Sequence, residues 1–212
     1  VGNQVFTPPN TSQTVILVPG QVEDDASIRH GSPEIYRNLD LLRTVHESNP
    51  EAYIIYKPHP DVVSGNRGGQ VSAEDMARYA DQTAPEADIL TCLQYANEVH
   101  TMTSLTGFEA LLRGKKVVCY GLPFYAGWGL TEDRLPIARR TRSLKLWELI
   151  AGTLIYYPGY VHPDTRHMID AATAIDVLKM QKSVQKNNTR LHKSWLSKQI
   201  GKIKQLYRSL SS

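Results

Sequence analysis

A single histidine stands between two prolines in the segment Lys57-Pro58-His59-Pro60, directly after a run of apolar residues. Proline restricts its own backbone and that of the preceding residue, so the orientation of the His59 ring is largely fixed in advance. A preorganised imidazole suits hydrogen bonding to a phosphate group, and Lys57 adds positive charge beside it. The alternative is a loop histidine that hydrogen-bonds only to the backbone.

A second segment with chemical potential reads "TSLTGFEALLRG" and begins at Thr103. A helix starting here would point backbone N–H groups at an anion, with the hydroxyls of Ser104 and Thr106 as further donors. Gly107 would let a phosphate approach closely, and Glu109 could accept hydrogen bonds from a ribose diol. The alternative is an ordinary capped helix with a favourable glutamate in its first turn. The absence of a GxGxxG or GxxxxGK motif argues against a dinucleotide site or a P-loop.

Two glycine-containing loops carry further candidates. Asn66 and Arg67 in "SGNRGG" could contact the carboxylate or phosphate of a sugar donor, or could belong to a solvated loop. Tyr125 and Trp128 in "YAGWG" could line a ligand cleft, or could pack within their own loop.

The elements that must position these residues alternate along the chain. Apolar, β-type runs predict strands over 14–19, 52–57, 87–92, 98–103 and 115–121. Helical periodicity, caps and terminal glycines predict helices over 32–48, 72–80, 105–114, 143–156 and 163–182. Strands separated by helices indicate an α/β fold, a Rossmann-like parallel sheet with helices on both faces. Because ligands bind beyond the carboxyl ends of such strands, the polar loops are expected to meet at one edge.

Length and composition fit one α/β domain. The chain has 212 residues, of which 41% are hydrophobic and 21% charged, as in ordinary globular proteins. No apolar run approaches the ~20 residues of a membrane span, and the polar opening segment does not resemble a signal peptide. The first residue is Val rather than Met, so a longer polypeptide is expected. The two cysteines lack CxxC spacing, which favours buried thiols and a cytoplasmic location.

The charge is divided unevenly along the chain. No acidic residue follows Asp176, whereas nine of the 24 basic residues do, which leaves 15 basic against 21 acidic residues before them. The tail also carries apolar residues at helical spacing, namely Leu196, Ile200, Ile203, Tyr207 and Leu210. This pattern predicts a basic amphipathic helix that lies on an anionic membrane surface through residues 190–212. The alternative is a helix that packs on another domain. Nucleic-acid binding is not expected, since the body is acidic and aromatic residues do not alternate with the tail bases.

Four collinear segments carry a family resemblance over about residues 14–165. They are "VPGQVEDDAS", "YKPHPDVVSGNR", "HTMTSLTGFEALLRGKKVVCYGLPFYAGWGLTEDR" and "YYPGY". Together they resemble the KpsC/LipB-type capsule polysaccharide proteins, which are retaining β-Kdo transferases. The resemblance implies a GT-B architecture of two Rossmann-like domains, with CMP-β-Kdo as the sugar donor and a lipid-linked acceptor. The chain resembles the C-terminal, donor-binding half, so the N-terminal half with the general acid/base is expected to be missing.

The resemblance also implies roles for individual residues. His59 matches the family's phosphate-contacting histidine, Ser104 and Thr106 match its hydroxyl loop, and Glu109 matches its nucleotide-side carboxylate. Asp25 aligns with the nucleophile, in a pattern completed by Gln21 and Ser27. The alternative for Asp25 is a helix cap near residue 27. Although Glu23, Asp24 and Asp25 form an acidic cluster, the resemblance implies neither a metal nor a cofactor.

The resulting domain hypothesis is a linker over 1–13, a nucleotide-sugar-binding domain over 14–182 and a basic helix over 183–212. The predicted function is the donor-binding part of a β-Kdo transferase in capsule synthesis, located in the cytoplasm or peripherally on the inner membrane. Two alternatives stay open: a GT-B transferase or epimerase domain for another nucleotide sugar, and a non-catalytic module that docks on a membrane or a partner.

Overall fold

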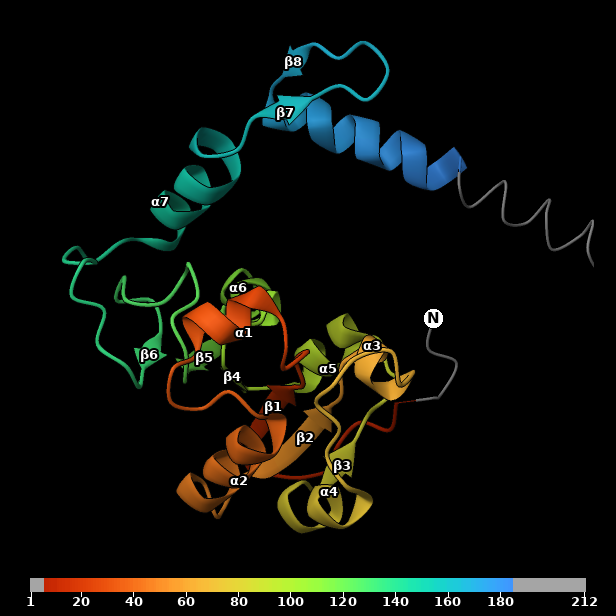
Figure 1. Ribbon diagram of the computed structural model, residues 1–212, viewed down its shortest axis with the longest axis vertical. Helices are drawn as coiled ribbons and strands as arrows, with labels where there is room; N and C mark the ends of the chain where they lie inside the picture. Colours follow the sequence, from red (N-terminus) through yellow and green to blue (C-terminus); the bar gives the residue numbers. More distant parts are fainter. Residues whose placement is uncertain (1–5, 185–212) are drawn as a thin grey trace, which may run out of the picture. The chain divides into compact units, whose positions relative to one another are not determined.

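The computed structural model describes residues 6–184, and the chain divides into two compact units, Val1–Leu149 and Ile150–Ser212 (Figure 1). The predicted domain of residues 14–182 spans parts of both units. The basic helix predicted over 183–212, and the membrane contact predicted for residues 190–212, lie outside the described residues from residue 185 onward. Phe6, from the predicted linker, lies against Tyr95 with the ring centroids 5.6 Å apart, so this end of the linker is part of the first unit.

Six parallel strands form one sheet in the order β3-β2-β1-β4-β5-β6. They are β1 Val15–Pro19, β2 Tyr53–Lys57, β3 Gln82–Thr83, β4 Glu98–Thr101, β5 Lys116–Cys119 and β6 Glu132–Asp133. In the centre of the sheet, Leu17 pairs with Ile55 on one side and with Val99 on the other. These central strands are almost wholly buried, as both-sided coverage of a parallel sheet requires.

Helices cover both faces of the sheet, because successive strand residues point to opposite sides. On one face, strand residues such as Ile16 and Ile54 form a hydrophobic core with Leu41 and Leu42. That core includes residues of α1 (Ala26–Gly31) and α2 (Asn38–Ser48), and α4 (Ala73–Tyr79) packs against it. On the other face, α5 (Ile89–Tyr95) contacts β1, and α6 (Leu105–Leu111) contacts β4 and β5. The predicted α/β fold is therefore confirmed.

The order of the strands creates a switch point at the carboxyl edge of the sheet. The chain runs outward from β1 to β2 and β3, and then returns to place β4 on the other side of β1. The loops after β1 and β4 diverge there, which is where such sheets bind ligands. Gly20 follows β1, and a Cβ at this position would lie 2.9 Å from the Tyr56 hydroxyl oxygen and 3.2 Å from the backbone nitrogen of His59. A glycine therefore lets the β1 loop approach the Pro-His-Pro segment.

Two predicted elements of the first unit differ from the structure. Residues 87–92 were expected to be a strand but contain the start of α5, because Asp88 accepts a hydrogen bond from the Leu90 backbone N–H (2.7 Å) and caps a helix. The helix expected over 32–48 begins at Asn38. Ser32 instead ends α1, and its hydroxyl donates to the carbonyl of Ile35.

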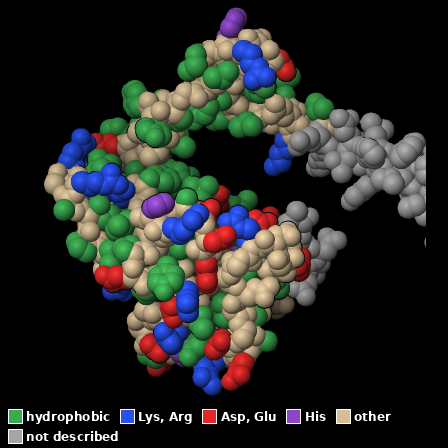
Figure 2. Space-filling view, viewed as in Figure 1, with side chains coloured by type: hydrophobic (Ala, Val, Ile, Leu, Met, Phe, Trp, Pro, Cys, Tyr) green, Lys and Arg blue, Asp and Glu red, His purple; other side chains and the backbone are tan. Residues whose placement is uncertain are grey.

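The second unit contains the π-helix Gly152–Tyr156, an antiparallel hairpin of β7 (Tyr160–Val161) and β8 (Met168–Ile169), and a helix over 171–184. The helix expected over 143–156 is α7 (Leu146–Ala151) followed by the π-helix, and the one expected over 163–182 begins after the hairpin. Hydrophobic side chains stand on the surface of this unit (Figure 2), including the strongly exposed Tyr156 and Tyr157. Within residues 6–184, no helix is both long and apolar enough to cross a bilayer.

Candidate functional site

A cleft of about 550 Å³ opens at the carboxyl edge of the sheet. Four of the predicted binding residues line it, namely Lys57, His59, Ser104 and Thr106. They come from the ends of β2 and β4, which lie on opposite sides of β1. The structure therefore brings together two segments of the chain that the sequence separates by about 45 residues.

His59 is held by the backbone that follows it. It is the N-cap of α3 (Pro60–Val63), and its Nδ1 accepts a hydrogen bond from the Asp61 backbone N–H at 3.2 Å. Since Nδ1 accepts, the ring proton belongs on Nε2. The His59 side chain is 39% exposed, so Nε2–H is available as a donor within the cleft. The predicted backbone bond and the predicted ligand contact can thus use different nitrogens of one ring.

Lys57 is a buried cation on the cleft wall. It is 7% exposed, and its ammonium donates one hydrogen bond among the described residues, from Nζ to the carbonyl of Pro85 at 3.0 Å. An ammonium has three donors, so two are left for another partner. Burial lowers the pKa of Lys57, against the opposing influence of Glu86 and Asp88. A buried, under-bonded ammonium in a cleft is a binding group for an anion.

The hydroxyl loop after β4 forms the start of α6. Ser104 is the N-cap, and its Oγ accepts from the Thr106 backbone N–H (3.2 Å) and donates to the Thr106 hydroxyl (3.1 Å). Gly107 has a different role from the predicted one, because a Cβ there would lie 2.2 Å from the Tyr125 hydroxyl. The Tyr125 ring thus fills the space that a Cβ of residue 107 would take, and Gly107 does not line the cleft in which a phosphate was expected.

Glu109 lies one turn further along α6 and does not line the cleft. Its Oε2 atom is buried and has no hydrogen-bond partner among the described residues. Its predicted contact with a ribose therefore stays a prediction.

Gln21 joins the loop after β1 to the loop after β4. Its Oε1 accepts from the Thr101 hydroxyl and from the backbone N–H groups of Thr103 and Ser104, at 3.0 to 3.1 Å. Its Nε2 donates to the Thr103 hydroxyl at 2.9 Å. The side chain is buried and well bonded, so Gln21 positions the two loops.

Asp25 is the N-cap of α1, as the alternative interpretation predicted. Its Oδ1 accepts from the backbone N–H of Ser27 (2.8 Å) and from the Ser27 hydroxyl (2.6 Å). These bonds lower the pKa of Asp25 and keep the exposed carboxyl ionised. The Oδ2 atom makes no hydrogen bond within residues 6–184. The Ser27 hydroxyl also accepts from the Thr103 hydroxyl at 3.4 Å, next to Ser104 in the chain, but neither Asp25 nor Ser27 lines the cleft. A cap and a nucleophile can therefore use different oxygens of one carboxylate.

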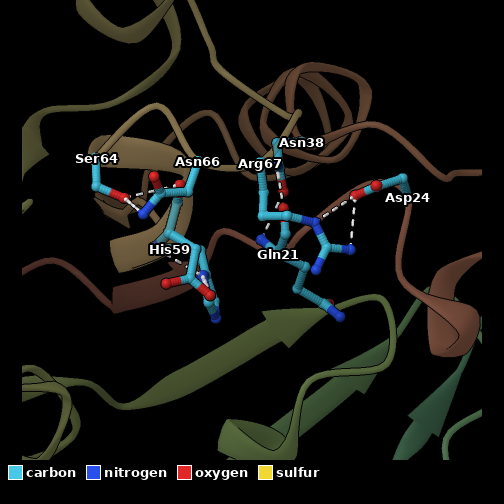
Figure 3. Close-up of polar contacts among 8 residues, drawn as sticks. Gln21, Asp24, Asn38, His59, Ser64, Asn66 and Arg67 are labelled. Carbon is cyan, nitrogen blue, oxygen red and sulfur yellow. Dashed lines mark hydrogen bonds and ion pairs between the residues drawn. The ribbon is translucent and has the colours of Figure 1, made fainter.

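The glycine-rich loop after α3 (residues 64–69) lies against the loop that follows β1 (residues 20–25, the β1 loop), as Figure 3 shows. Arg67 donates from Nε and Nη2 to Oδ1 of Asp24, at 3.1 and 2.9 Å, and this contact lowers the pKa of Asp24. Asn66 donates to the Ser64 hydroxyl at 2.8 Å and remains within its own loop.

Tyr125 and Trp128 do not line this cleft, contrary to the expectation. Tyr125 is fully buried and donates from its hydroxyl to the Ser104 carbonyl at 2.5 Å. Trp128 donates from Nε1 to the Phe124 carbonyl at 2.8 Å, and the Arg140 guanidinium lies 5.4 Å from the centre of its ring. Tyr125 therefore packs against the start of α6, whereas Trp128 contacts its own loop and Arg140.

Sequence reasoning missed two parts of the site. Glu86 and Asp88 line the cleft, but Asp88 was assigned to the strand expected over 87–92 and Glu86 was not singled out. The Asp at a helix start, followed by apolar residues, was the available signal. Asn38 is buried and bridges Gln21 to Gly69, a contact with no local sequence signal. In the part of the chain that the structure describes, no three His, Cys, Asp or Glu side chains are grouped so as to hold a metal ion.

Comparison with known proteins gives consistent matches. The family model for capsule polysaccharide biosynthesis proteins matches residues 6–160. The capsule polysaccharide modification protein LipA of Neisseria meningitidis serogroup B is 74% identical over 209 residues, which are 99% of this chain and 30% of LipA. The lipopolysaccharide-processing protein LpsZ of Rhizobium meliloti is 44% identical over 175 residues, 82% of this chain and 40% of LpsZ. The chain thus spans less than half the length of these curated relatives.

Solved structures with the same fold include two β-Kdo transferase structures of KpsC from Thermosulfurimonas dismutans. The β-Kdo 2,7-transferase is 49% identical with a TM-score of 0.75, covering 82% of this chain and 56% of that one. The β-Kdo 2,4-transferase is 32% identical with a TM-score of 0.68, covering 83% and 54%.

Proposed function

This chain belongs to the capsule polysaccharide biosynthesis protein family, as its motifs predicted, and we propose that it binds CMP-β-Kdo for a retaining β-Kdo transferase. The likeness to KpsC supports a glycosyltransferase of this kind. The supporting observation within the site is the pairing of Lys57 and His59 at the switch point of the sheet, in one cleft with two hydroxyls.

The cleft is suited to the phosphate of the nucleotide. Within residues 6–184 the buried ammonium of Lys57 leaves two donors unused, and the Nε2–H of His59 supplies a directed one. Hydrogen bonds from charged groups to phosphate are the stronger ones. Thr106 adds a neutral hydroxyl donor in the same cleft, since the O–H of Ser104 is already donated to the Thr106 oxygen. On the same cleft, the carboxylates of Glu86 and Asp88 are suited to accept hydrogen bonds from the hydroxyls of ribose or sugar.

Asp25 supplies the nucleophile in this proposal. Two successive displacements at the anomeric carbon give retention of configuration, and in this proposal a carboxylate first replaces the nucleotide. The free Oδ2 of Asp25 attacks the anomeric carbon, and the bond from that carbon to the phosphate oxygen breaks. CMP leaves with the bonding electron pair, and the sugar is held as an ester. An acceptor hydroxyl then attacks the same carbon, loses its proton to a base, and restores the Asp25 carboxylate.

The acceptor in this proposal is lipid-linked, and the base and the acceptor site belong to the second domain of a GT-B enzyme. Residues 190–212 would then hold the protein at an anionic membrane surface, peripherally on the cytoplasmic side. Neither the donor site nor the reaction needs a metal or a cofactor in this scheme.

Thermal unfolding with CMP, UMP and UDP tests the proposal. At a CMP concentration of 100 times Kd, binding should add about 2.7 kcal/mol of stability, which raises Tm by about 5–10 °C in a chain of this size. UMP and UDP should give smaller shifts at equal concentration. A larger shift with UDP would favour a domain for UDP-sugars, and no shift with any nucleotide would favour a non-catalytic docking module.

A further inference from the structure

We propose that Arg67 is a positioning residue, which couples the His59 segment to the loop that carries Asp25 through its ion pair with Asp24. This inference rests on the proposed function, because it assigns a part in the same reaction. Neither Arg67 nor Asp24 lines the cleft, so their effect must act through the loops that they join.

One end of this coupling is the short helix α3, which begins at His59. The backbone N–H groups of Asn66 and Arg67 both donate to the carbonyl of Asp61, at 3.0 and 3.1 Å. Asp61 is the residue whose own N–H bonds the His59 ring. The glycine-rich loop is therefore folded back onto the helix turn that sets the orientation of His59.

The other end is the β1 loop, and buried contacts hold it against the glycine-rich loop. Asn38 donates from Nδ2 to the carbonyls of Gln21 (2.7 Å) and Gly69 (2.8 Å). A Cβ at Gly69 would lie 2.8 Å from that same Nδ2, and the φ angle of Gly69 is +119°. The two loops are thus packed too closely there for any residue but glycine.

Nearer to Asp25, the contact between the loops depends on side chains. The backbone N–H of Glu23 is 3.4 Å from the carbonyl of Gly68, a long hydrogen bond. Beyond it, both guanidinium donors of Arg67 converge on Oδ1 of Asp24, whose neighbour in the chain is Asp25 (Figure 3). A planar guanidinium fixes its partner in direction as well as distance. The ion pair therefore restrains the β1 loop at the residue next to the proposed nucleophile.

The charge of Arg67 also bears on the same loop. Its guanidinium contributes to the lowered pKa values of both Asp24 and Asp25, with Arg29 as a second nearby cation. Three carboxyl groups lie near Arg67, those of Asp24, Asp25 and Asp61. Removing this cation would leave them to repel one another and to displace the loop.

A double-mutant cycle on the 212-residue chain tests the inference. The variants are Arg67→Ala, Asp24→Ala and the double variant, with Arg67→Lys as the version that keeps the charge and loses the planar fork. Three readouts are taken: CMP affinity by calorimetry, the rate of glycosyl-ester formation from CMP-Kdo by intact mass spectrometry, and amide hydrogen exchange over residues 21–27.

The expected result separates binding from reaction. CMP affinity should stay within about twofold, because an exposed pair outside the cleft contributes little to it. Ester formation should slow by about tenfold in each single variant, since small misplacements of reacting groups are costly. The double variant should be no slower than either single one, as for residues that act through each other. Exchange over 21–27 should accelerate in all variants, and Arg67→Lys should fall between them and wild type.

Unchanged ester formation in the variants, or additive losses in the double variant, would overturn the positioning role while the proposed function stands. A wild-type chain that binds CMP but forms no ester would overturn the positioning role together with Asp25 as the nucleophile, and one that does not bind CMP would overturn the proposed function as well.

Discussion

Replacing Lys57 by methionine should have opposite effects on folding and on nucleotide binding. The ammonium is 7% exposed, and among residues 6–184 it has a single hydrogen bond, to the carbonyl of Pro85, so the fold carries a buried charge without a direct ion pair. Methionine has similar length and no charge, and it can fill the same space. Removing the charge should stabilise the free protein by about 1 kcal/mol, which raises Tm by roughly 2–4 °C.

The same change should weaken CMP binding. A hydrogen bond between an ammonium and a phosphate contributes about 1.5–3 kcal/mol, or roughly 10- to 150-fold in Kd. Thermal unfolding without ligand measures the first effect, and calorimetry with CMP measures the second. Lys115→Met is the matched control, because Lys115 also donates to a backbone carbonyl, that of Gln94 at 3.4 Å, but lies outside the cleft. A Lys57→Met protein that is less stable and binds CMP as wild type does would refute the assignment of Lys57 as an anion-binding group.

Four further outcomes are expected. His59→Ala should weaken CMP binding by about 1–3 kcal/mol in calorimetry, whereas His162→Ala, whose Nδ1 also accepts a backbone N–H, should leave it unchanged; equal affinities would remove His59 from the site. Asp25→Asn should preserve the helix cap and CMP binding but abolish the glycosyl ester detected by mass spectrometry, and an ester in this variant would identify another nucleophile. CMP affinity should fall as pH rises through the lowered pKa of Lys57, because phosphate binds the protonated form; calorimetry from neutral pH upward that shows constant affinity contradicts this. Burial lowers the pKa of His100, so the unfolded chain gains protons first and stability is lost as pH falls from 6.5 toward that lower value. In His100→Gln, the free energy of unfolding measured with urea should depend less on pH over this range. An unchanged dependence on pH would show that other groups cause it.

Local chemistry along the chain was sufficient to predict much of the site. The two prolines around His59 determine its backbone wherever the segment lies, and the structure gives it a defined ring orientation. The helix predicted over 72–80 is α4, and the Ser72 hydroxyl caps it by accepting from the Asp75 backbone N–H at 3.0 Å. The apolar β-type runs became β1, β2, β4 and β5. These features depend on neighbouring residues, which is why the sequence alone could predict them.

Other features depended on residues far apart in the chain. Whether residues 87–92 form a strand or a helix is ambiguous in so short an apolar run; in the structure the Asp88 cap begins α5, and this helix packs on β1. The sequence allowed Tyr125 to line a cleft, but in the structure its hydroxyl donates to the Ser104 carbonyl and lies next to Gly107.

The contact between Arg67 and Asp24 is of the same kind, since 43 residues separate the two. What the sequence determined by itself was therefore the backbone of each segment and the chemistry that it carries. Which side chains face the cleft, which are buried, and which loops are held together was decided by the tertiary structure, because a parallel sheet brings the ends of distant strands to one edge and long-range contacts then join their loops.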